Sequence, residues 1–180
     1  MILPITESVN LKPLATEDAP VLFSLINENR AYLKEWLPWL DDNTREEHSR
    51  SFIASTIESR AHGSSLVFGV FHNETLVGVC GFNTIDRRYN FAEIGYWLAE
   101  NMNGKGIITR CVEKLIAYAF VQLNLEKVYV SVATDNIRSR AVCERLELPV
   151  DQIMPGAGNL YGKAVDQIRY VARKKQRHGL

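Results

Sequence analysis

The chain has 180 residues, about the length of one domain on the usual range of roughly 100–200 residues. Hydrophobic residues make up 46% and charged residues 23%, which is close to a globular average and excludes a disordered or low-complexity chain. The 21 basic residues balance 21 acidic residues, so the formal net charge is zero. A neutral chain lacks the basic surface of a protein that coats nucleic acid, and direct nucleic-acid binding is not expected.

The spacing of cysteines and histidines indicates in which compartment the protein works and whether it binds a metal. The three cysteines are far apart and form no CxxC pair, which favours a reducing compartment. The four histidines lack the close spacing of a zinc site, so no metal is expected. There is no signal-peptide pattern and no run of about 18 apolar residues. We therefore expect a cytoplasmic protein without membrane contact, with one domain over residues 1–180 and a core at about residues 9–174.

The first half of the chain predicts one strand, two helices and a hairpin. Alternating apolar residues predict a strand at Val9–Leu14, and the segment from Thr16 to Pro20 resembles a helix start. The segment 44–47 (TREE) has the pattern of a capping box, followed by a helix that ends near His62 and Gly63. The β-rich runs 66–71 and 76–82 are joined by the polar segment 72–75, which predicts a hairpin.

The second half predicts alternating strands and helices. The strands are expected at 90–98, 127–134, 150–154 and 166–172, and the helices after residue 106 and at 137–146. The first of these helices carries apolar residues at 3.6-residue spacing from Ile108 to Leu123. This order implies an α/β (α+β) fold in which helices cover both faces of a central sheet. The basic segment 173–178 is expected to be a solvated terminus, with contact to the ribosome as the alternative.

A glycine-rich loop lies between a strand and this long helix. Gly104 and Gly106 flank Lys105, and glycines at a helix N-terminus allow backbone N–H groups to converge on an anion. Ala99 replaces the first glycine of a Walker loop, and Thr109 replaces the last glycine of GxGxxG. A phosphate site of another kind and a plain turn both remain open from the loop alone.

Four segments of the chain, one of which contains this loop, together match the pattern of a known family. The segments 36–39 (WLPW), 93–97 (EIGYW), 104–109 (GKGIIT) and 135–142 (DNIRSRAV) together resemble the GNAT superfamily of N-acetyltransferases. Within it, they are similar to the Rim-type (RimJ/RimL) ribosomal-protein N-terminal acetyltransferases. The resemblance covers roughly residues 9–174. It implies the GNAT fold, with a mixed, mostly antiparallel sheet, and acetyl-CoA as cosubstrate without a metal.

This chain departs from the family pattern at two places. The family loop reads Arg/Gln-x-x-Gly-x-Gly/Ala, and here Asn103 and Ile108 replace its first and last positions. Backbone N–H groups make the bonds to pyrophosphate, so these changes are tolerable. Glu147 and Leu148 stand where the family commonly has Gly-Phe. The role of the divergent region 146–162, which should border the substrate cleft, is open.

The resemblance implies two catalytic residues. Glu93 matches the glutamate that many GNAT enzymes use as a base through a water, and the alternative is an ordinary strand carboxylate. Ser139 matches a serine that would protonate the leaving thiolate, and the alternative is a helix cap. Relatives often place a tyrosine on this helix, but none lies between Ile137 and Leu146. Whether Glu93 or a chain of waters is the base stays open.

The same resemblance implies binding residues. The pantetheine arm would pair with the strand backbone around Trp97, Leu98 and Ala99, and Asn136 would both cap the next helix and contact this arm. Trp36, Trp39 and Tyr96 are candidates for the acceptor pocket, with core packing as the alternative. The expected pyrophosphate loop comprises Asn103, Gly104, Lys105, Gly106, Ile107, Ile108 and Thr109.

The predicted function is transfer of acetyl from acetyl-CoA to the N-terminal α-amino group of a ribosomal or other protein. The family transfers directly in a ternary complex. One alternative is an acetyltransferase for a small amine, such as a polyamine, amino sugar or antibiotic. An alternative of another class is an acyl-CoA-binding sensor without turnover. Homodimers are common in this branch, but the sequence does not fix the oligomeric state.

Overall fold

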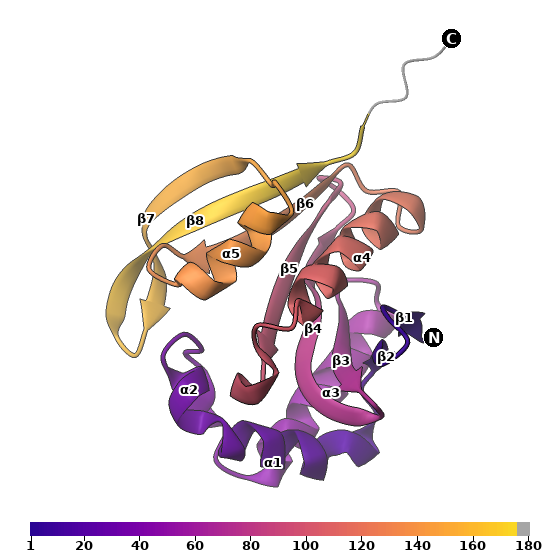
Figure 1. The fold of residues 1–180 in the computed structure, drawn as a ribbon, viewed down its shortest axis with the longest axis vertical. Coiled ribbons are helices and arrows are strands. Elements are labelled where there is room, and N and C mark those ends of the chain that lie inside the picture. Colours follow the sequence, from indigo (N-terminus) through magenta and orange to yellow (C-terminus); the bar gives the residue numbers. More distant parts are fainter. Residues whose placement is uncertain (176–180) are drawn as a thin grey trace.

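The computed structural model describes residues 1–175, so part of the predicted basic terminus, residues 176–178, lies outside the described residues. An eight-stranded sheet has the strand order β1-β2-β3-β4-β5-β6-β8-β7 (Figure 1). The pairs are antiparallel except for β5 and β6, which run parallel. The strands are β1 (Leu3–Pro4), β2 (Val9–Pro13), β3 (Leu66–His72), β4 (Thr75–Asp86), β5 (Phe91–Leu98), β6 (Lys127–Ala133), β7 (Val150–Leu160) and β8 (Lys163–Arg173).

Helices cover both faces of this sheet. They are α1 (Ala19–Glu28), α2 (Arg30–Lys34), α3 (Glu46–Ala61), α4 (Ile107–Val121) and α5 (Ile137–Arg145), with short 3₁₀ turns at Thr16–Asp18, Leu40–Asp42 and Glu100–Met102. Successive strand residues point to opposite faces, so Val79 joins the cluster beneath α1 and α3, whereas Cys80 joins the cluster beneath α4 and α5. The predicted α/β fold with a mostly antiparallel sheet and helices on both faces is confirmed.

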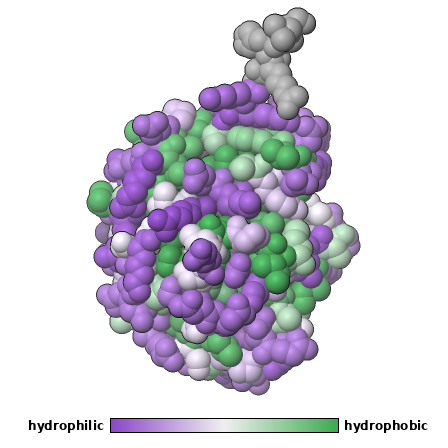
Figure 2. Space-filling model, turned by 45° about the vertical axis from the view of Figure 1, so that its right-hand side comes forward, coloured by the Kyte–Doolittle hydropathy of each residue, from purple (hydrophilic) through white to green (hydrophobic). Residues whose placement is uncertain are grey.

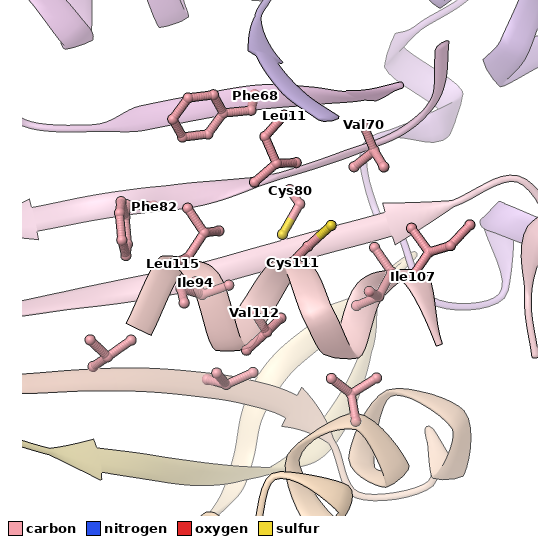
Figure 3. Packing of buried hydrophobic residues seen from close by; sticks show 14 of the residues in the cluster. Leu11, Phe68, Val70, Cys80, Phe82, Ile94, Ile107, Cys111, Val112 and Leu115 are labelled. Carbon is pink, nitrogen blue, oxygen red and sulfur yellow. The ribbon is translucent and has the colours of Figure 1, made fainter. Parts of the chain in front are cut away.

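The larger core lies between α4 and the middle of the sheet. Cys111 and Leu115 on α4 are fully buried, and they face Phe68, Cys80 and Phe82 from β3 and β4 (Figure 3). These α4 residues recur at helical spacing, as the sequence predicts. This packing fixes the N-terminus of α4, and with it the glycine-rich loop, against the ends of β4 and β5.

The outer surface mixes polar and apolar side chains. On the face shown in Figure 2, hydrophilic residues lie between several separate apolar areas. Within residues 1–175, no helix combines the length and the apolar character that crossing a membrane requires.

The start of α3 differs from the prediction. The proposed capping box at 44–47 is wrong, because α3 begins at Glu46 and its N-cap, Arg45, makes no side-chain capping bond. Instead, the backbone N–H of Thr44 donates to Nδ1 of His48 at 3.1 Å. Sequence patterns also missed β1 and α2, which are too short to show periodicity, and they predicted β7 and β8 shorter than they are.

Helix α5 ends in a left-handed residue that is not glycine. Glu147 has a φ of 54°, and Leu148 N–H donates to the Cys143 carbonyl at 3.1 Å, the bond pattern that commonly places glycine at this position. A non-glycine residue in this conformation costs roughly 1–2 kcal/mol. The departure from the family's Gly-Phe therefore costs stability at the entrance to β7.

Replacing Glu147 with glycine should stabilise the protein. Relief of roughly 1–2 kcal/mol of strain exceeds the roughly 0.4–1 kcal/mol that glycine adds to the entropy of the unfolded chain. We expect Glu147→Gly to raise the free energy of unfolding in urea by about 0.5–1 kcal/mol. Glu113→Gly, at an exposed position inside α4, should lower it by about 1 kcal/mol. A loss of stability in Glu147→Gly would contradict this account of the helix end.

Candidate active site

Strands β5 and β6 separate after a short paired segment. Their pairing begins at Phe91 with Lys127 and ends at Glu93 with Tyr129. From there β6 stays paired with β8, while the remainder of β5 turns away from it (Figure 1). Two cavities, with volumes of about 640 and 420 Å³, open along this divergence.

The larger cavity, called the wide cavity below, lies between the segment 36–43 and the strands on either side of the divergence. Its walls include Trp36 and Trp39 from that segment, Trp97 from β5 and Ser131 from β6. Residues 157–160 of β7 close it on one side, so the divergent region 146–162 does border a cleft. Phe52 and His48 from α3 complete the wall.

The smaller cavity, called the narrow cavity, runs between α2 and the N-terminus of α5. Tyr32 and Leu33 from α2 form one wall, and Asp135 and Arg138 form the other. Asn103 and Ile108 place its far end beside the glycine-rich loop. The two cavities share six residues, which form their common junction: Trp36, Leu37, Tyr96, Trp97, Asn136 and Ser139.

The glycine-rich loop exposes its backbone and the side chain of Lys105. Gly104 and Gly106 have φ values of 77° and 69°, and Gly106 is the N-cap of α4. The side chains of Ile107 and Ile108 are buried in the core, so these residues can offer only backbone N–H groups to an anion. Lys105 is exposed between the glycines, and Thr109 is half-buried in the first helical turn.

Asn103 braces this loop. Its side-chain nitrogen donates to the Glu100 carbonyl at 2.9 Å and to the Tyr32 hydroxyl at 3.1 Å. The same hydroxyl accepts a 2.7 Å hydrogen bond from Arg138. The loop, α2 and α5 are thus joined around the mouth of the narrow cavity.

Among residues 1–175, the backbone of β5 beyond Glu93 has no strand partner on the side of the divergence. The N–H of Ala99 donates to the Val77 carbonyl at 2.8 Å, so Ala99 turns its backbone toward β4. Backbone groups of successive strand residues point in opposite directions, which directs Trp97 toward β4 and Leu98 and Tyr96 toward the open side. Of the predicted pantetheine-binding residues 97–99, Leu98 is the one whose backbone faces the gap.

Ser139 and Asn136 lie at the N-terminus of α5, at the junction of the cavities. The Asn136 side chain accepts a hydrogen bond from the Ser139 N–H at 3.1 Å, so the structure assigns the capping to Asn136. Ser139 itself is half-buried and lines both cavities. Its hydroxyl is therefore not the helix cap.

Glu93 lies nearer the N-terminal end of β5. It is the last residue of this strand that pairs with β6 before the two strands diverge. It is half-buried, opposite Thr84 on β4 and Tyr129 on β6. Within the described part of the chain, it is not among the residues that line either cavity. Asn83, which bulges out of β4 next to Thr84, does line the wide cavity and covers Gly95.

The three predicted acceptor-pocket aromatics, Trp36, Trp39 and Tyr96, all line the wide cavity. The rings of Trp39 and Trp97 pack with centroids 6.3 Å apart. Tyr96 differs from the tryptophans, because its hydroxyl is engaged by a carbonyl of α5. Sequence patterns do not indicate Asn83, because a β-bulge has no reliable sequence signal.

The wide cavity carries little charge. Among its described lining residues, Asp42 is the one side chain with a formal charge at neutral pH, and none is Lys or Arg. His48 is the other ionisable polar group besides tyrosine, and its Nδ1 accepts the Thr44 N–H. Within residues 1–175, no cluster of three or more His, Cys, Asp or Glu side chains could hold a metal ion.

The turn between β7 and β8 closes the end of the wide cavity. The Tyr161 hydroxyl donates to the Leu37 carbonyl at 2.5 Å, and Lys34 lies 4.9 Å from the centre of the Tyr161 ring. Lys34 also pairs with Asp41 at 2.9 Å. These contacts link the turn to the segment that carries Trp36 and Trp39.

Comparison with known proteins identifies the arrangement. The family described as "Acetyltransferase (GNAT) domain" matches residues 8–148. The ribosomal-protein-serine acetyltransferase of Escherichia coli (strain K12) is 30% identical over 141 residues, which are 78% of this chain and 79% of that protein.

Two solved structures share the fold closely. RimL, described as a ribosomal L7/L12 alpha-N-protein acetyltransferase in complex with coenzyme A, has a TM-score of 0.92 at 26% identity, covering 96% of this chain and 98% of that chain. The microcin C7 self immunity acetyltransferase MccE, in complex with acetyl-CoA and AMP, has a TM-score of 0.91 at 27% identity, covering 94% of each chain. The predicted Rim-type resemblance is confirmed. The chain belongs to the GNAT acetyltransferase family and is an acyltransferase that uses acetyl-CoA.

Proposed function

We propose that this enzyme transfers acetyl directly from acetyl-CoA to the α-amino group of a protein N-terminus, with both substrates bound at once. One observation carries the proposal: two cavities meet in the divergence between β5 and β6 and share a junction that includes Ser139. The narrow cavity leads to the glycine-rich loop, whereas the wide cavity lies between the segment 36–43 and residues 157–160 of β7. A donor and an acceptor can therefore reach one point from different sides.

The donor would occupy the narrow cavity. Its pyrophosphate would accept hydrogen bonds from the backbone N–H groups at the start of α4, where the helix dipole favours negative charge. The amides of its pantetheine arm would pair with the unpaired backbone of β5 at Leu98, as an added strand does. Asn136, at the junction, would contact the end of that arm nearest the thioester.

A carboxylate at Gly106 should weaken this binding. Gly106→Glu would bring a negative charge to the phosphates, and one unfavourable pair near 4 Å is worth about 1–4 kcal/mol between water and protein-surface conditions. We therefore expect the Kd for CoA, measured by calorimetry, to rise at least about tenfold. Gly63→Glu is the matched control, since Gly63 has a φ of 70° and lies after α3. Equal affinity in both variants would contradict a phosphate site at this loop.

The electrostatics of the wide cavity favour an α-amine as acceptor. An α-amino group with a pKa near 8 is already about a tenth neutral at pH 7, whereas a lysine or polyamine nitrogen near 10.4 costs about 4.6 kcal/mol to deprotonate. The cavity lining offers Asp42 and His48 as its acid–base groups besides tyrosine. The absence of Lys and Arg from this described lining gives no attraction for an anionic acceptor.

The chemistry at the junction needs few groups. The amine nitrogen attacks the thioester carbon, the C–S bond breaks, and the Ser139 hydroxyl protonates the departing sulfur. The proton that nitrogen loses in this step passes through water to the serine and restores its hydroxyl. An acceptor that arrives as an ammonium group first gives its extra proton through water to Glu93, which leaves the neutral amine that attacks. Because Glu93 does not line the cavity, this relay would run past Asn83, which lies at the neighbouring position of β4.

Glu93→Gln should therefore be most harmful at low pH. Near pH 6.5 the acceptor amine is largely protonated and needs a proton acceptor, whereas near pH 9 it is already neutral. We expect a loss of turnover at pH 6.5 that shrinks toward pH 9, measured by release of CoA thiol. Glu113→Gln is the control, because it makes the same change from carboxylate to carboxamide at an exposed position on α4. It should leave the pH profile of turnover unchanged. A loss independent of pH would remove Glu93 as a base.

The acceptor class can be tested with a panel of amines. The relatives named for ribosomal proteins support a protein N-terminus, and ribosomal proteins are the first acceptors to test. We expect CoA release with Ser- or Ala-starting peptides, with a mass gain of one acetyl on the α-amine. The same peptides with a blocked α-amine and a free lysine are the matched control and should be inert.

The AMP in the MccE structure supports one alternative, a small-molecule acceptor, because it shows that a structural relative binds a nucleotide together with its donor. Release of CoA with polyamines, amino sugars or aminoacyl nucleotides, and none with peptides, would move the assignment to that class. Tight binding of acetyl-CoA without release on any acceptor would favour the acyl-CoA sensor.

A further inference from the structure

One side chain joins the two sides of the divergence at the level of the junction. The Tyr96 hydroxyl, from β5, donates to the Ser139 carbonyl on α5 at 2.9 Å. The same hydroxyl lies 4.0 Å from Sγ of Cys143, one turn farther along α5. Backbone pairing between β5 and β6 has already ended at Glu93, so this contact spans a region where the sheet no longer connects the two sides.

The environment of this hydroxyl favours its protonated form. Burial raises the pKa of Tyr96 well above its usual value, and the nearby Cys143 thiol acts in the same direction. The proton is directed at a backbone carbonyl and not at the open space of either cavity. Tyr96 is thus a permanent hydrogen-bond donor to the helix and is poorly placed to protonate a leaving thiolate.

The backbone N–H and the carbonyl of Ser139 are each hydrogen-bonded to a side chain. Its N–H donates to the Asn136 side chain at 3.1 Å, and its carbonyl accepts the Tyr96 hydroxyl. The orientation of its Cα–Cβ bond, and hence the reach of its hydroxyl, is set by α5 and β5 together. Because β5 carries the unpaired backbone at Leu98, the same strand would align the donor thioester and the serine.

We propose that Tyr96 is a positioning residue that fixes Ser139 relative to the β5 backbone, and that it is not a contact for the acceptor. This inference rests on the proposed role of Ser139.

The test is a double-mutant cycle with Tyr96→Phe and Ser139→Ala. The phenylalanine keeps the ring packing and removes one hydrogen bond, worth about three- to tenfold in kcat. The KM for acetyl-CoA should stay within about twofold, since the backbone of β5 is unchanged. Ser139→Ala should slow transfer more, with acetyl-CoA affinity nearly intact. Adding Tyr96→Phe to Ser139→Ala should cause no further loss, because the hydroxyl being positioned is already gone.

Tyr170→Phe is the matched control. The Tyr170 hydroxyl also holds α5, accepting from Arg140 and donating to Glu144 at 3.2 Å each. None of these three residues is among the described residues that line either cavity. We expect this variant to keep wild-type kcat. Multiplicative losses in the cycle, wild-type kcat in Tyr96→Phe, or an effect of Tyr96→Phe with none of Ser139→Ala would each overturn the proposal.

A readout without turnover separates this proposal from the proposed function. Tyr96→Phe should speed hydrogen exchange of the backbone amides at 139–143 about three- to tenfold, while Tyr170→Phe leaves the first turn of α5 unchanged. Unchanged exchange in Tyr96→Phe would overturn the positioning role even if transfer occurs. Faster exchange in a protein that acetylates no amine would support the positioning of Ser139 and refute the acetyl transfer.

Discussion

The end of backbone pairing between β5 and β6 is the constraint on which the site depends. Pairing stops at Glu93 and Tyr129, and a β-bulge at Asn83 of β4 lies at the same level on the other side of β5. A bulge bends the strand that carries it and increases the local twist, and here it lies at the level where β5 leaves its parallel neighbour. The backbone groups freed along β5 need hydrogen-bonding partners, and an extended ligand with amide groups can supply them.

The remaining parts of the site are fixed around this gap by side chains from distant segments. Arg30 donates to the carbonyls of Leu40 at 2.7 Å and Asn43 at 2.6 Å, which holds the segment carrying Trp36 and Trp39. The turn between β7 and β8 contacts the same segment from the other side. Core packing of α4 holds the glycine-rich loop. The elements that form the walls of the two cavities are therefore held in place by the sheet and by core packing. The two cavities meet at the first turn of α5.

The fold could be predicted from periodicity because most strands and helices bury one face. Cys111 and Leu115 recur at helical spacing, and the two positive-φ glycines, Gly104 and Gly106, mark the loop before α4. The capping box before α3 failed because Thr44 uses its backbone and not its side chain. The Tyr96–Ser139 contact joins residues 43 positions apart, and the bulge at Asn83 has no local signal. Such long-range contacts depend on the relative placement of elements, which sequence patterns do not encode.

We propose that donor and acceptor enter the divergence from different sides and meet at Ser139. A crystal structure with a bisubstrate conjugate, in which CoA is linked through an acetyl bridge to the α-nitrogen of a serine-starting peptide, would show both paths at once. We expect the pyrophosphate on the backbone of 104–107, the sulfur beside Ser139, and the peptide in the wide cavity against Trp39. A peptide that leaves through the narrow cavity, or a pyrophosphate bound away from the start of α4, would contradict it.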